Sequence, residues 1–139
     1  MRGQGPRAVA VVAFAALARI GPAAAAAVPA LVSELASPDG GRRWRAAKGL
    51  GRIGPGANAA VPELIAALED PWERVGAHAA RALGRIGDTS PSIAAALQGA
   101  TGAASAWVRG EARKALAQLQ QAGAEAAEPR VVSDPGDPR

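Results

Sequence analysis

The chain has 139 residues and a formal net charge of +4, and it contains no cysteine, no tyrosine and a single histidine. A His/Cys metal site, a cysteine nucleophile and a cysteine-based redox centre are therefore excluded within one chain. Alanine is abundant, and because it is the best helix former, this composition predicts a helical protein. A chain of this length is expected to form one domain.

The first predicted helix, residues 7–20, is apolar on nearly every side. With Met1, Arg2 and the small residues 23–27 it also resembles a secretion signal, in which case residues 1–27 direct export. We favour a repeat helix in a cytoplasmic protein, because residues 17–22 share a motif with later segments. An apolar terminal helix without polar capping residues predicts self-association through this helix. About ten apolar residues are too few to cross a membrane.

A short motif recurs every 33 residues along the chain. Between two copies, residues 59–69 have apolar side chains at helical spacing, Asp70 and Pro71 break the chain, and a second helix is predicted over 72–86. A glycine follows each second helix, as expected for a left-handed cap. The sequence thus predicts two helices per repeat and no strand. The copies are Leu17-Ala-Arg-Ile20-Gly21-Pro22, Leu50-Gly-Arg-Ile53-Gly54-Pro55, Leu83-Gly-Arg-Ile86-Gly87 and Leu116-Ala-Gln-Leu119.

The last repeat departs from this spacing, because Pro62 and Leu68 correspond to Pro91 and Leu97 at a distance of 29 residues. The loop before this first helix is therefore predicted to be four residues shorter. The turn after it, residues 99–105, is predicted to be longer and to be the most mobile internal loop.

The second helices resemble those of short HEAT-like repeats, the type also found in phycobilisome lyase subunits. The pattern Val-Arg-x-x-Ala-x-x-Ala-Leu-x-x-Ile-Gly appears as Val75-Gly76 through Ala79, Ala82-Leu83 and Ile86-Gly87, and as Val108-Arg109 through Ala112 and Ala115-Leu116. The resemblance implies an all-α solenoid of about three and a half helix-turn-helix repeats, forming a right-handed superhelix. We place this domain at residues 1–121, with second helices ending near residues 20, 53, 86 and 119. Residues 122–139 are proline-rich and predicted to be disordered.

HEAT-like repeats often join neighbouring turns by a ladder of Asp and Arg side chains. In this sequence the resemblance implies one such pair, between Arg43 and Asp70. Gly76 interrupts the arginine positions, so no continuous ladder is expected.

A basic stripe is predicted on the second helices, opposite their buried side. Arg45, Lys48 and Arg52 share one helix face, and His78, Arg81 and Arg85 occupy the same places one repeat later. His78 is interpreted as a solvent-facing structural residue. Trp72 and Trp107 are expected to pack against turns, whereas Trp44 flanks the stripe. The candidate partner-binding residues are Arg19, Trp44, Arg45, Lys48, Arg52, Arg81 and Arg85.

The resemblance implies that the second helices line a concave surface. We therefore predict a non-enzymatic protein-protein interaction or scaffold module that binds an acidic protein partner there. A solvated basic face without a partner, a nucleic-acid-binding module and, by resemblance alone, a chromophore-lyase subunit are the alternatives. No catalytic residue, cofactor or metal site is predicted. Residues 49–54 match the dinucleotide fingerprint, but they close a helix instead of joining a strand to one.

Overall fold

The computed structural model describes residues 25–127, and this part of the chain is an all-α array without strands. The predictions for the first helix, the secretion signal, Arg19 and the end of the tail fall outside these residues. The elements are α2 (Val28–Leu35), α3 (Gly40–Ile53), the 3₁₀ segment η2 (Gly54–Ala60), α4 (Val61–Ala67), α5 (Glu73–Ile86), α6 (Pro91–Ala100) and α7 (Ala106–Ala127).

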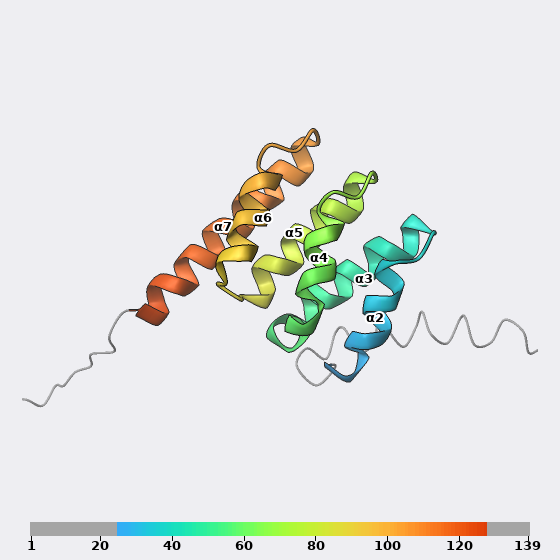
Figure 1. The fold of residues 1–139 in the computed structure, drawn as a ribbon, viewed down its shortest axis with the longest axis horizontal. Coiled ribbons are helices and arrows are strands. Elements are labelled where there is room, and N and C mark those ends of the chain that lie inside the picture. Colours follow the sequence, from blue (N-terminus) through green and yellow to red (C-terminus); the bar gives the residue numbers. More distant parts are fainter. Residues whose placement is uncertain (1–24, 128–139) are drawn as a thin grey trace, which may run out of the picture.

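The helices form two layers, with the first helices α2, α4 and α6 on one side and the second helices α3, α5 and α7 on the other (Figure 1). Neighbouring second helices contact one another along much of their length, whereas the first helices touch each other at few positions. The second helices therefore form the more extensively packed of the two layers.

Small residues allow the second helices to approach closely. A Cβ atom at Gly51 would lie 3.1 Å from Cα of Ala82, and one at Gly84 would lie 2.9 Å from Cα of Ala115. The two contacts are related by the 33-residue period. Glycine against alanine is thus the repeated packing device between second helices.

The helix ends follow the predicted motif. Gly54 and Gly87 have φ angles of 76° and 79°, a region that residues with a Cβ rarely adopt. The amide of Gly87 donates to the carbonyl of Leu83 at 3.3 Å and caps α5. Apolar side chains of both layers fill the space between them, and Leu50, Leu64 and Leu83 are fully buried.

Two predictions for the last repeat are wrong. Helix α7 continues to Ala127, six residues into the segment predicted to be disordered, because four of residues 122–127 are alanine, the best helix former. The turn between α6 and α7, residues 101–105, is no longer than the turn 68–72 between α4 and α5. The extra residues of the last repeat instead lengthen α6, which has 10 residues where α4 has 7.

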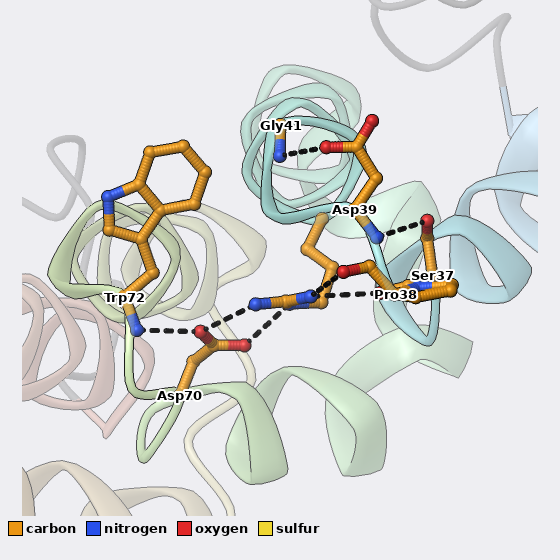
Figure 2. Close-up of polar contacts among 7 residues, drawn as sticks. Ser37, Pro38, Asp39, Gly41, Asp70 and Trp72 are labelled. Atoms are coloured by element: carbon orange, nitrogen blue, oxygen red, sulfur yellow. Dashed lines mark hydrogen bonds and ion pairs between the residues drawn. The ribbon is translucent and has the colours of Figure 1, made fainter.

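The predicted pair between Arg43 and Asp70 is confirmed. The Nε and Nη2 atoms of Arg43 donate to the two carboxylate oxygens of Asp70 at 2.8 and 3.1 Å, and Nη1 donates to the carbonyls of Ser37 and Pro38. Asp70 also accepts the amide of Trp72 at 2.9 Å (Figure 2). Arg109 repeats only the carbonyl contacts, to Ala103 and Ala104. This ion pair therefore joins two neighbouring repeats, and no ladder continues through residues 25–127.

Candidate interaction surface

Charge is divided between the two layers of the array. All eleven Lys and Arg residues of the described part lie on second helices, together with three glutamates. The other six acidic residues of this part lie on first helices or in loops. The α3 helix alone carries five cations and no acidic residue. The second-helix layer is therefore basic, and most acidic residues lie on the first helices and in the loops.

The exposed part of the second-helix layer contains most of the predicted stripe. Arg45, Lys48, Arg52 and Arg85 are exposed, and within residues 25–127 none of them forms an ion pair. We call these four residues, together with Trp44, the basic surface. Arg81 differs from them, because its Nη2 atom lies 3.0 Å from Oε2 of Glu111 and its Nε atom donates to Oε1 at 3.3 Å.

Trp44 is half-buried and docks between two repeats. Its ring lies 5.1 Å from the ring of His78, measured between centroids. Three cations surround the same ring, with Arg74 at 4.6 Å and Arg45 and Lys48 at 5.6 and 5.7 Å from its centroid. Because a ring face attracts cations within about 6 Å, Trp44 holds these side chains together on the surface.

The prediction that His78 faces solvent is wrong, since only 9% of the residue is exposed. Its ring lies between Trp44 and Trp107, whose ring centroid is 5.9 Å away. The helical periodicity of the sequence predicts that His78 shares the exposed helix face of Arg45. In the structure, the rings of Trp44 from α3 and Trp107 from α7 cover His78 on that face. The Nδ1 atom lies 2.9 Å from the carbonyl of Arg74. A carbonyl can only accept, so Nδ1 carries the proton and Nε2 is the nitrogen that titrates.

Burial lowers the pKa of His78 below its ordinary value of 6.5, and the positive charges of Arg81, Lys48 and Arg74 lower it further. The hydrogen bond to the carbonyl of Arg74 opposes this shift only in part. At neutral pH the imidazole is therefore uncharged, although it lies among cations.

This lowered pKa predicts that the protein loses stability as the pH falls below about 6.5, because the unfolded chain then takes up a proton that folded His78 resists. Thermal unfolding between about pH 7.5 and pH 5.5 measures the effect. His78→Gln should flatten the curve over this range. Glu111 and Asp88 have lowered pKa values, so the stability that their charged forms contribute is lost only when the pH falls to about their ordinary pKa values of 4.5 and 3.8 or lower. A variant with the same slope as the parent would contradict this assignment.

Sequence reasoning missed two residues that lie next to the basic surface. Arg74 covers the ring of Trp44, and Glu111 is buried while its carboxylate binds Arg81. The hydrogen bonds from Arg81 lower the pKa of Glu111, so this carboxylate is charged at neutral pH. The sequence did contain a signal for this pair. Residues 33 apart hold equivalent positions in neighbouring repeats. Opposite charges 30 residues apart are therefore offset by about one helical turn and lie on facing parts of neighbouring second helices.

A groove of about 620 Å³ lies between α4 and α6 in the first-helix layer, and sequence reasoning did not anticipate it. Ile65, Leu68 and Ala96 line it together with Glu69 and Glu73. It forms beside Gly99, where an added Cβ would meet no atom within 4 Å. Because its charged side chains are acidic, this groove does not suit an acidic ligand.

No helix within residues 25–127 has the length and apolar character needed to cross a membrane. The same residues contain no group of three or more His, Asp or Glu side chains placed to hold a metal ion.

Comparison with known proteins agrees with this architecture. The family model described as HEAT repeats matches residues 28–117 and again residues 61–133. No curated protein matches the chain. The matches span the helix pairs that the structure describes, from α2 through α7. The chain belongs to the HEAT repeat family.

Proposed function

We propose that this protein is a non-catalytic interaction module that binds an acidic segment of a partner protein on its basic surface. HEAT repeats generally mediate protein-protein interactions in scaffolds, and the family is typically non-catalytic. The observation that carries the proposal is the division of charge, with every Lys and Arg of residues 25–127 on the second helices.

The geometry supports a protein ligand with carboxylates. Lys48, Arg52 and Arg85 are exposed and lack an acidic partner in the described part of the chain, so binding would not require an internal ion pair to break. Complementary charge of this kind speeds association and selects acidic partners. Trp44 adds an aromatic contact at the centre of the cations, the residue type that often anchors interfaces.

The double variant Arg52→Ala/Arg85→Ala is expected to weaken binding of a fluorescein-labelled Asp- and Glu-rich peptide by at least about tenfold, measured by fluorescence anisotropy. Both side chains are exposed, so the free energy of unfolding should change by less than about 0.5 kcal/mol. Arg113→Glu on α7 is the matched control, because it lowers the net charge by the same amount at an exposed position outside the basic surface. Equal loss of binding in both variants would indicate a nonspecific charge effect and contradict the proposal.

The same assay separates a protein partner from nucleic acid. A nucleic-acid backbone binder loses affinity steeply with salt because counterions are released. Binding of the acidic peptide at moderate salt, with weaker binding of a DNA or RNA oligonucleotide, is the expected result. Oligonucleotide binding with a steep salt dependence and no peptide binding would favour the nucleic-acid alternative.

A further inference from the structure

A small cavity of about 90 Å³ opens between α3 and α5 in the second-helix layer. A single water molecule needs about 10–15 Å³ of such space, so the cavity has room for several waters or one small oxyanion. No acidic side chain lines it. Its lining residues are Ala47, Lys48, Gly51, Arg52, His78, Arg81, Ala82 and Arg85.

The 33-residue period allows a direct comparison with the next interface, between α5 and α7. There the position of His78 is occupied by Glu111, and the position of Lys48 is occupied by Arg81. The carboxylate of Glu111 lies between Arg81, at 3.0 Å, and Lys114, at 3.7 Å. The α3/α5 interface has the corresponding cations, Lys48 and Arg81, but a neutral imidazole where the carboxylate would be.

We propose that the His78 cavity is an oxyanion site, in which a carboxylate or phosphate group of a ligand takes the place that Glu111 fills one repeat later. The inference rests on the proposed function and names the anchoring subsite of the basic surface. Lys48 and Arg52 donate to the oxyanion from α3, and Arg85 donates from α5. Arg81 adds its positive charge while Nε and Nη2 remain bound to Glu111.

Binding in this site is coupled to the protonation of His78. The groups that face the imidazole are Lys48 and Trp44 from α3, Arg74 and Arg81 from α5, and Glu111 and Trp107 from α7. Cations outnumber the single carboxylate, so the neutral imidazole is favoured in the empty site. A bound oxyanion reverses this balance and favours protonation at Nε2, which then donates to the ligand. Affinity therefore increases as the pH falls.

The single histidine makes the test direct, because the imidazole proton spectrum of the full chain contains one residue. Proton NMR titrations are recorded with inorganic phosphate, with an Asp- and Glu-rich peptide and with the same peptide carrying phosphoserine. The pKa of His78 is expected to rise by about one pH unit or more when an oxyanion binds. A response to phosphate and phosphopeptide alone assigns the site to phosphate, and a response to all three assigns it to oxyanions in general.

Two substitutions at His78 test the equivalence with Glu111. His78→Glu supplies an internal carboxylate to Lys48 and Arg81 and should weaken oxyanion binding by at least about tenfold. His78→Gln should retain binding and lose its dependence on pH between about 5.5 and 7.5. Arg113→Ala is the control for His78→Glu, because it also lowers the net charge by one at an exposed position away from the cavity. Circular dichroism verifies that each variant is folded.

The outcomes separate the two proposals. Peptide binding that depends on Arg52 and Arg85 but leaves the His78 resonance unchanged would overturn the oxyanion site and leave the proposed function standing. A His78 response to inorganic phosphate without binding of any acidic peptide would support the site and contradict the proposed function. Unchanged oxyanion affinity in folded His78→Glu would also overturn the site.

Discussion

Replacing Leu83 by alanine is expected to lower the free energy of unfolding by about 2.7–5 kcal/mol, the range for leucines removed from well-packed cores. Leu83 has no exposed surface and lies on the central second helix α5, which packs against both α3 and α7. The cavity that the substitution leaves would therefore weaken both interfaces. Urea unfolding followed by circular dichroism measures the effect.

Leu116 provides a matched control, because it occupies the position of Leu83 one repeat later. It is only partly buried, since no further repeat within the described residues covers α7. Leu116→Ala should therefore cost clearly less than Leu83→Ala. Equal effects of the two substitutions would mean that α7 is covered in solution by a second copy or by residues outside 25–127.

The helix pairs could be predicted from the sequence because they depend on repeated local signals. Leu50, Ile53 and Gly54 recur with the period, and each acts within its own helix or cap. The pair of Arg43 and Asp70 could also be inferred, since the resemblance assigned both residues to neighbouring turns. To predict these features, it is enough to know the spacing of the residues and that successive repeats stack on one another.

The environment of His78 could not be predicted in the same way. A helical wheel gives the direction of a side chain from its own axis, but it does not show the size of the neighbours that meet it there. Trp44 and Trp107 come from different positions of their repeats, and they approach His78 only when three second helices are packed together. The irregular positions of the repeat therefore determine the candidate site, while the regular positions determine the fold.

Gly84→Ala is expected to destabilise the protein by about 1–3 kcal/mol, although alanine is the better helix former. The new Cβ atom would lie 2.9 Å from Cα and 3.0 Å from Cβ of Ala115, so α5 and α7 would have to move apart. Backbone atoms of a packed helix cannot yield as the end of a flexible side chain can. The separation would also disturb the neighbouring ion pair between Arg81 and Glu111.

Gly110→Ala on α7 isolates the packing effect from helix propensity. A Cβ atom at Gly110 would meet no atom within 4 Å, so this substitution should stabilise the protein by roughly 0.5–1 kcal/mol. Chemical unfolding of the two variants beside the parent chain is the measurement. Gly84→Ala should lower the free energy of unfolding and Gly110→Ala should raise it, because the same methyl group is added between two packed helices in the first variant and in open space in the second. A gain in stability from both substitutions would show that α5 and α7 are packed more loosely than the Gly84 contact requires.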